Sequence, residues 1–412
     1  MTQADLSQTP KVYGWCPGAL RPMMSGDGLV VRVRPPLGRL TPDQARGLAD
    51  LSQRCGSGLL DVSARANLQL RGIRDTAYDA LIDGLRHLEL LDEDAAAEAR
   101  RNIAITPFWQ PGDDSHRIAS ALAAALSAAD DLVLPGKFGF VVDCGPTPVL
   151  RDTAADIRIE RCDTGVMLRA DGADHGLALT AETVAQEAIA LARWFLDQGG
   201  APEGRGRMRQ LIARRALPAS HVAPVLNAPR AATPQPGPTE SGVLVALEFG
   251  QMPAATLAAL ADHGALRLTP WRMLLIEDDS DAAHHTAPTH TAPTLAAPTQ
   301  SDLALEGLIL EGRDPRLRVT ACTGAPNCHQ ARSTTRNLAR DLAAYVPAGR
   351  HLHVSGCAKG CAHPRATDYV LTATDPDVFD LIRNGTAADQ PLHTSLSARA
   401  LRAAPDFLTE GN

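Results

Sequence analysis

The sequence of 412 residues predicts an α+β protein with two related halves, each made of a small strand-and-helix unit followed by a larger α/β unit. Three observations lead to this fold class. The order strand, helix, strand, strand occurs twice along the chain. A longer segment with mixed helix and strand patterns follows each copy. Between the halves, residues 223–241 are rich in proline and are expected to form a linker.

The first copy of the pattern is expected at residues 12–78. Its helix should begin after Thr41, because threonine accepts hydrogen bonds from the free N–H groups of a helix N-terminus. The elements expected are a strand at 29–34, a helix at 42–55, and a strand pair at 58–62 and 67–71. A larger α/β unit at 79–222 follows, and its Ala-rich helices at 118–129 and 181–196 are expected to cover a sheet.

The second copy is expected at residues 242–277. It should contain a strand at 242–248, a helix at 253–263, and strands at 265–269 and 272–277. The repetition predicts an internal duplication of a ferredoxin-like half-domain, although two such short runs can also resemble each other by chance. Residues 278–302, rich in proline, threonine and histidine, are expected to be a disordered insertion, and residues 303–405 to form the second α/β unit.

The composition excludes several classes of protein. A net charge of −7 argues against a general nucleic-acid binder. The N-terminal residues lack the basic and apolar regions of a secretion signal, and the chain has no uncharged run long enough to span a bilayer. Eight cysteines in so long a chain do not form the disulfide framework of a small secreted domain. These features indicate a protein of the reducing cytoplasm.

Four cysteines near the C-terminus, Cys322, Cys328, Cys357 and Cys361, form two close pairs. The second pair is expected on a loop after a strand at 351–355, where a rigid sheet would hold it. Four thiolates bind either zinc or an iron–sulfur cluster. Structural zinc sites usually have about two to four residues between paired ligands, whereas five separate Cys322 and Cys328. The spacing therefore favours a [4Fe–4S] cluster over zinc or four unrelated buried thiols.

Polar residues alternate along the strand expected at 67–71 and the residues just before it. Residues two apart share one face of a strand. The residues on this face would be Arg65, Asn67, Gln69 and Arg71. Such donors suit a ligand with several carboxylates, because arginine binds a carboxylate with two parallel hydrogen bonds. A solvated strand face is the alternative interpretation.

Two further basic residues, Arg101 and Lys137, are candidates for anion binding. Arg101 lies in the run Arg100-Arg101-Asn102, directly before an expected strand. Lys137 lies in the run Leu134-Pro135-Gly136-Lys137-Phe138-Gly139, before a strand at 140–143. Each residue taken alone is equally consistent with an ordinary surface charge.

These motifs as a set resemble the nitrite/sulfite reductase superfamily, from about residue 14 to residue 376. The resemblance implies duplicated ferredoxin-like half-domains with two larger α/β domains. It also implies that the four cysteines bind a [4Fe–4S] cluster, with Cys361 bridging to the iron of sirohaem. The basic residues that match Arg65, Arg101 and Lys137 would hold an anionic substrate over the tetrapyrrole.

The sequence departs from the reductases at several positions. Gly139 stands where sulfite reductases typically have a second lysine. The second copy also lacks the polar strand face, since Trp271, Met273 and Leu275 stand where the first copy has Arg65, Asn67 and Gln69. The N-terminal runs Cys16-Pro17-Gly18, Arg21-Pro22-Met23 and Ser25-Gly26-Asp27-Gly28 resemble a different branch of the superfamily, the precorrin-3B synthases of cobalamin synthesis.

In that branch the tetrapyrrole is the substrate. The resemblance implies an oxygen-dependent monooxygenase that converts precorrin-3A to precorrin-3B, with hydroxylation of a meso carbon and formation of a γ-lactone. It implies a [4Fe–4S] cluster, an additional mononuclear non-haem iron, and electrons that come from NAD(P)H. Because the sequence has no Gly-rich nucleotide-binding motif, we expect a separate electron donor.

Some assignments stay open at this point. His351 and His353 share one face of a strand near Cys357, which is typical both of a two-histidine iron site and of ordinary strand histidines. Cys16 could line the substrate groove or be a plain buried thiol. The alternative functions are a sirohaem-dependent nitrite or sulfite reductase, and a tetrapyrrole or metal carrier with structural zinc.

Overall fold

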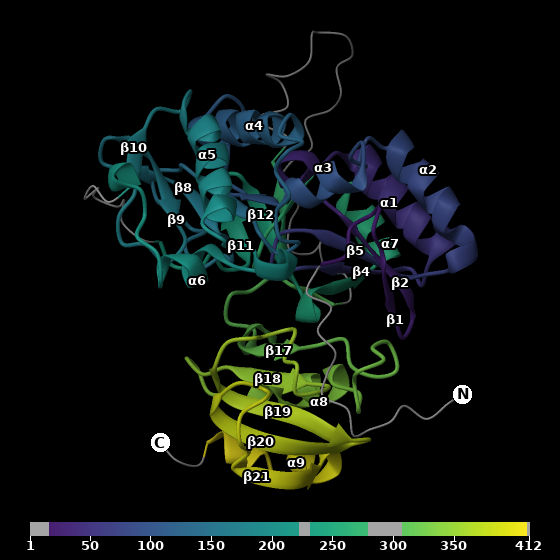
Figure 1. Ribbon diagram of the computed structural model, residues 1–412. Coiled ribbons are helices and arrows are strands. Elements are labelled where there is room, and N and C mark those ends of the chain that lie inside the picture. The colour runs from purple at the N-terminus through teal and green to yellow at the C-terminus, as the bar shows by residue number, and fades with distance from the viewer. Residues whose placement is uncertain (1–15, 222–230, 279–306, 410–412) are drawn as a thin grey trace.

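The computed structural model describes residues 16–221, 231–278 and 307–409 (Figure 1). All but the first residue of the insertion predicted at 278–302, and the first part of the predicted linker, 223–230, lie outside these ranges. The described residues form four sheets with helices packed on them. In Figure 1 the sheet of residues 319–397 lies apart from the other three, at the lower end of the view. The predicted α+β class and the duplicated architecture are confirmed.

Two of the sheets belong to the ferredoxin-like half-domains. The first consists, in spatial order, of β1 (Met23–Ser25), β2 (Gly28–Val33), β5 (Leu68–Ile73), β4 (Leu59–Val62) and β13 (Gln251–Pro253). The second consists of β11 (Gly237–Thr239), β12 (Gly242–Leu247), β15 (Met273–Glu277), β14 (Leu266–Leu268) and β3 (Arg39–Leu40), with β16 (Leu308–Ile309) also paired to β12. Each sheet therefore takes its last strand from the other copy. The two half-domains are interlocked by this exchange.

The backbone repeats the same turns in both copies. After β2 the chain turns at Leu37, with a φ of 53°, and after β12 it turns at Phe249, also with a φ of 53°. Each of these residues is followed by a glycine in the left-handed region, Gly38 at 68° and Gly250 at 77°. This turn directs β3 and β13 into the opposite sheet. The duplication is thus present in local conformation as well as in element order.

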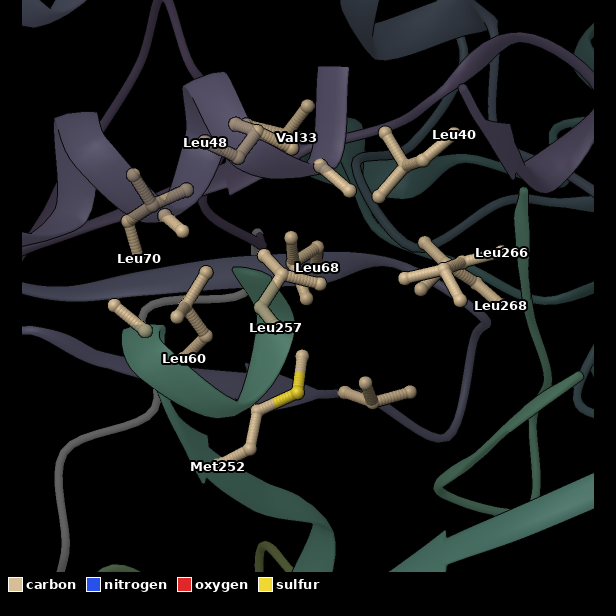
Figure 2. Close-up of a cluster of buried hydrophobic side chains, with 14 of the residues drawn as sticks. Val33, Leu40, Leu48, Leu60, Leu68, Leu70, Met252, Leu257, Leu266 and Leu268 are labelled. Atoms are coloured by element: carbon tan, nitrogen blue, oxygen red, sulfur yellow. The ribbon is translucent and has the colours of Figure 1, made fainter. Parts of the chain in front are cut away.

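One core serves both half-domains. Helix α1 (Pro42–Cys55) begins at Thr41, whose hydroxyl accepts a hydrogen bond from the Gln44 N–H while the Gln44 side chain accepts one from the Thr41 N–H. Figure 2 shows Leu48 of α1 and Leu257 of α7 (Ala254–Leu260) in one cluster of buried side chains with Leu68 of β5. Helix α2 (Tyr78–His87) packs on the outer side of α1. Removal of this shared apolar surface from water stabilises the two halves as a unit.

The two larger α/β units have identical sheet topology. The first sheet contains β10 (Leu177–Leu179), β9 (Gly165–Ala170), β8 (Ile157–Cys162), β7 (Phe140–Asp143) and β6 (Ile103–Ile105). The second contains β17 (Val319–Ala321), β18 (Leu352–Ser355), β19 (Thr367–Asp375), β20 (Val378–Gly385) and β21 (His393–Ser397). In each sheet the first three strands along the chain run parallel to one another. The fourth strand runs antiparallel to the third, and the fifth antiparallel to the fourth.

Helices cover both of these sheets. The helices of the first unit are α3 (Ala95–Arg100), α4 (Asp114–Ser127), α5 (Val184–Asp197) and α6 (Met208–Ile212). Those of the second are α8 (Arg336–Leu342) and α9 (Ala398–Ala403). Among the described residues, none of the helices is both long and apolar enough to cross a membrane.

Two predictions from the sequence need correction. Residues 237–239, assigned to the linker, form β11 and pair with β12, because the second copy repeats the β1–β2 hairpin of the first. The strand expected at 67–71 begins at Leu68, so Arg65 and Asn67 lie in the preceding turn. The Ser63 hydroxyl accepts hydrogen bonds from the N–H groups of Arg65 and Asn67, and Ala66 adopts a φ of 53°. These bonds stabilise a turn in place of an extended strand.

Candidate functional site

The four predicted cysteines meet at one edge of the second α/β sheet. Cys322 directly follows β17, with Cys328 on the same loop, and Cys357 and Cys361 lie on the loop after β18. Because β17 and β18 are parallel neighbours, both loops leave the sheet at the same edge. The Gly356 N–H donates to the Cys322 sulfur at 3.1 Å, which ties one loop to the other.

The environment of these thiols disfavours their ionisation when no cation is bound. Burial, together with the negative charges of Cys361, Cys322 and Cys328, raises the pKa of Cys357 to about 11. The pKa of Cys322 is also raised, first by burial. Thiols in such surroundings stay protonated at neutral pH unless a cation is bound among them. The four cysteines therefore interact electrostatically at one site.

The two cysteine loops pack closely against each other. In the described part of the chain, no three His, Cys, Asp or Glu side chains are arranged to hold one metal ion. A side chain at Gly356 would be excluded, because its Cβ would lie 2.7 Å from the Ala331 Cβ and 3.4 Å from the Cys322 sulfur. Cys361 is exposed whereas Cys357 is buried, so the site opens on the Cys361 side.

The first half-domain holds the Cys328 loop. The hairpin between β1 and β2 carries Ser25, whose hydroxyl donates to the Asn327 carbonyl at 2.8 Å. A side chain at Gly26 would collide with the Pro326 carbonyl, so only glycine permits this close approach. Arg71 also donates to the Asn327 carbonyl, at 3.0 Å. The Ser-Gly-Asp-Gly run of the sequence thus has a structural role next to a cysteine ligand.

Arg71 does not share the environment of the other predicted substrate-binding residues. Its guanidinium is buried and binds both carboxylate oxygens of Asp27, at 2.9 and 3.0 Å, and lies 3.7 Å from Asp61. A buried charge needs such partners. These bonds occupy the guanidinium on the side of the Cys328 loop. We leave Arg71 out of the proposed substrate-binding set because its contacts place it against the Cys328 loop, whereas Arg101, which also pairs with an aspartate, lines a cavity.

Arg65, Gln69 and Lys137 come together around Cys16. Arg65 donates to the Lys137 backbone carbonyl at 2.8 Å, and Gln69 accepts a hydrogen bond from Arg32 at 2.9 Å. Burial acts to raise the pKa of the Cys16 thiol, but the charges of Arg32, Arg65 and Lys137 outweigh it, and the pKa is lowered. This part of the site attracts anions.

Asn67 and Arg101 line a neighbouring cavity of about 320 Å³ together with Arg34. Arg101 binds the Asp92 carboxylate at 2.6 and 2.8 Å. Asn67 is only 3% exposed, yet its Nδ2 has no hydrogen-bond partner, and the Nε atoms of Arg32 and Arg34 also have none. Buried donors without partners are rare in folded proteins. Their concentration next to the basic residues indicates room for a ligand with acceptor oxygens.

The histidines near the cysteines lie close together, with the His363 ring 4.7 Å from the His351 ring and 5.8 Å from the His353 ring. Both ring nitrogens of His351 contact threonine hydroxyls, Thr320 and Thr367, at 3.0 Å each. His353 is fully buried with neither ring nitrogen bonded, and burial lowers its pKa to about 3. No carboxylate completes a metal-binding group with them among the described residues. We therefore assign no residues to a second iron.

The sequence analysis missed three arginines of this region, Arg32, Arg34 and Arg272. Arg32 and Arg34 alternate with the buried Val31 and Val33 along β2 and beyond its end, a period-two signal present in the sequence. Arg272 gave no such signal, since it lies in an apolar stretch of the second copy.

A comparison with known proteins identifies the family. Residues 21–88 match the model of the nitrite/sulfite reductase ferredoxin-like half domain. The chain is 30% identical to a precorrin-3B synthase from Sinorhizobium sp over 92% of its own length and 84% of the length of that protein. The chain belongs to the precorrin-3B synthase family.

Two further proteins resemble this member of the precorrin-3B synthase family. The chain is 23% identical to a ferredoxin–nitrite reductase from Leptolyngbya laminosa, over 87% of this chain and 79% of the relative. The solved structure of the NirA protein of Mycobacterium tuberculosis has a TM-score of 0.64 at 18% identity and covers 93% of this chain and 81% of that one. The structural likeness establishes the fold that the precorrin-3B synthase family shares with these proteins.

Proposed function

We propose that this protein converts precorrin-3A to precorrin-3B. Dioxygen would hydroxylate the meso carbon between rings A and D, and a ring A acetate would close a γ-lactone. One oxygen atom enters the product, and the other leaves as water with two electrons and two protons from an external reductant. We infer that these electrons come from NAD(P)H through a separate donor protein. The similarity to a precorrin-3B synthase along most of both chains supports this proposal.

Gly139 is the observation that favours this function over a sulfite reductase. A Cβ at this position would lie 2.7 Å from the Asn102 Nδ2, which donates to the Phe138 carbonyl at 2.8 Å. The lysine expected here in sulfite reductases therefore has no room unless Asn102 moves. Loss of that charge weakens a site for a small anion but leaves space for a macrocycle.

The basic residues suit a substrate that carries many carboxylate arms. We propose that Arg65, Gln69 and Lys137 bind and orient the macrocycle near Cys16, and that Asn67 and Arg101 contact it from the adjoining cavity. Charge-assisted hydrogen bonds of arginine to carboxylate are the strong kind. Burial, together with the like charges of Arg207 and Arg32, lowers the pKa of Arg65, so an anionic ligand would relieve this repulsion.

We propose that Cys322, Cys328, Cys357 and Cys361 hold a [4Fe–4S] cluster, which supplies electrons one at a time. The Gly356 N–H that donates to Cys322 would stabilise the thiolate form of this ligand. Cys361, on the exposed side, would be the ligand nearest to a bound tetrapyrrole.

The absorption spectrum of protein purified without air tests the proposal, together with counts of iron and sulfide. We expect about four irons and four sulfides per chain, broad absorption at the blue end, and no sirohaem bands. Conversion of added precorrin-3A with oxygen and a reductant should then follow. Bound sirohaem would instead identify a nitrite or sulfite reductase, and zinc without sulfide would identify a carrier.

Arg65→Ala is expected to raise the KM for the tetrapyrrole about 10- to 100-fold, since a charge-assisted hydrogen bond contributes about 1.5–3 kcal/mol. Steady-state kinetics measure this change. Arg86→Ala is the matched control, because Arg86 is exposed and pairs only with Asp83 on α2 among the described residues. An unchanged KM for Arg65→Ala would make the turn at 63–67 purely structural.

A further inference from the structure

Arg272 lies in the turn that directly precedes β15. The Thr269 hydroxyl accepts hydrogen bonds from the N–H groups of Trp271 and Met273, as Ser63 does for Arg65 and Asn67 in the first copy. Arg272 therefore occupies the position of Ala66, and both residues have a left-handed φ, of 63° and 53°. The backbone conformation is common to both copies, but the guanidinium occurs in only one.

The Arg272 side chain reaches the second cysteine loop. Its Nη2 donates to the Ala362 carbonyl at 2.7 Å, directly beside Cys361. Gly250 makes room for the side chain, since a Cβ there would lie 2.7 Å from the Arg272 Cδ. This contact joins the second half-domain to the Cys361 loop, as the Arg71 contact joins the first half-domain to the Cys328 loop.

The two arginines differ in the charges around them. Arg71 forms a bidentate ion pair with Asp27, so the Asp27 carboxylate neutralises its charge locally. Arg272 has no carboxylate within ion-pair distance among the described residues, and its electrostatic neighbours are Arg336, Asp61 and Cys322. Burial, followed by repulsion from Arg336, lowers its pKa, but a guanidinium stays protonated at neutral pH. Its positive charge therefore acts on the ligand set.

We propose that Arg272 positions the Cys361 loop and supplies a fixed positive charge that favours the reduced state of the cluster. This inference depends on the [4Fe–4S] assignment of the proposed function. Reduction adds one negative charge to the cluster, and the net charge around a cluster is one determinant of its reduction potential. A cation beside Cys361 would stabilise the reduced state more than the oxidised state.

Arg272→Gln, Arg272→Lys and Arg340→Gln test the proposal in a redox titration followed by electron paramagnetic resonance. Arg340→Gln is the control, because it removes one charge from the exposed face of α8, where Arg340 pairs with Glu248. We expect a more negative midpoint potential for Arg272→Gln, and potentials close to the parent value for Arg272→Lys and for the control. Iron and sulfide contents should match the parent protein in all three.

A parent-like potential in Arg272→Gln with full iron content would overturn the proposal. If Arg272→Gln does not retain iron, Arg272→Lys decides. Retained iron with the parent potential would support the role of the charge, whereas lost iron or a shifted potential would refute it. If the protein holds no [4Fe–4S] cluster, the parent protein itself would lack iron and sulfide and give no cluster signal. This outcome is distinct from a failure of the proposed role of Arg272.

Discussion

Cys361→Ser is expected to yield protein without the full content of iron and sulfide. Cys361 is one of four cysteines whose charges interact at a single site, and the other three cannot complete the coordination of a [4Fe–4S] cluster. Serine is a poor replacement, because its alcohol is not a soft thiolate ligand. Metal binding is coupled to folding, so the yield of soluble protein should fall as well.

Cys162→Ser is the matched control for this prediction. Cys162 ends β8 in the first α/β unit, and its sulfur lies 3.5 Å from the Thr164 hydroxyl, so a serine there has a hydrogen-bond partner. This variant should keep the parent content of iron and sulfide. Full metal content in Cys361→Ser, measured by chemical analysis of both elements, would show that the ligand assignment is wrong.

Features set by local chemistry could be predicted from the sequence. Thr41 and Pro42 placed the start of α1 correctly, because capping depends on residues within one turn of the helix. The loop of Cys357 and Cys361 was also placed correctly, since it follows the strand predicted at 351–355. Both signals depend only on neighbours in the chain.

Features set by contacts between distant segments could not be predicted. The exchange of β3 and β13 depends on strands of two and three residues, which are too short for a periodic pattern. The role of Arg71 depends on Asn327, which lies 256 residues away. The alternation from Arg65 to Arg71 predicted one polar strand face. The Ser63 hydrogen bonds instead stabilise a turn, so the strand begins only at Leu68 and the four residues lie in different surroundings.

Arg71→Ala is expected to lower the free energy of unfolding by about 3–5 kcal/mol, because it leaves the largely buried carboxylate of Asp27 without its ion-pair partner. Urea unfolding measures this loss. Arg54→Ala is the matched control, since Arg54 forms an exposed pair with Asp50 on α1. Its removal should leave the free energy of unfolding nearly unchanged, because exposed ion pairs contribute little.

The Asp27→Asn variant separates the two roles of Arg71. In the double variant Arg71→Ala, Asp27→Asn, a neutral amide replaces the unpaired Asp27 carboxylate, so part of the lost stability should return. Because Arg71 donates to the Asn327 carbonyl beside Cys328, we also expect Arg71→Ala to lower the iron content, and this loss should persist in the double variant. Recovery of iron together with stability would mean that Arg71 acts only through the ion pair. Recovery of stability alone would show that the direct hydrogen bond from Arg71 to the Asn327 carbonyl holds the Cys328 loop.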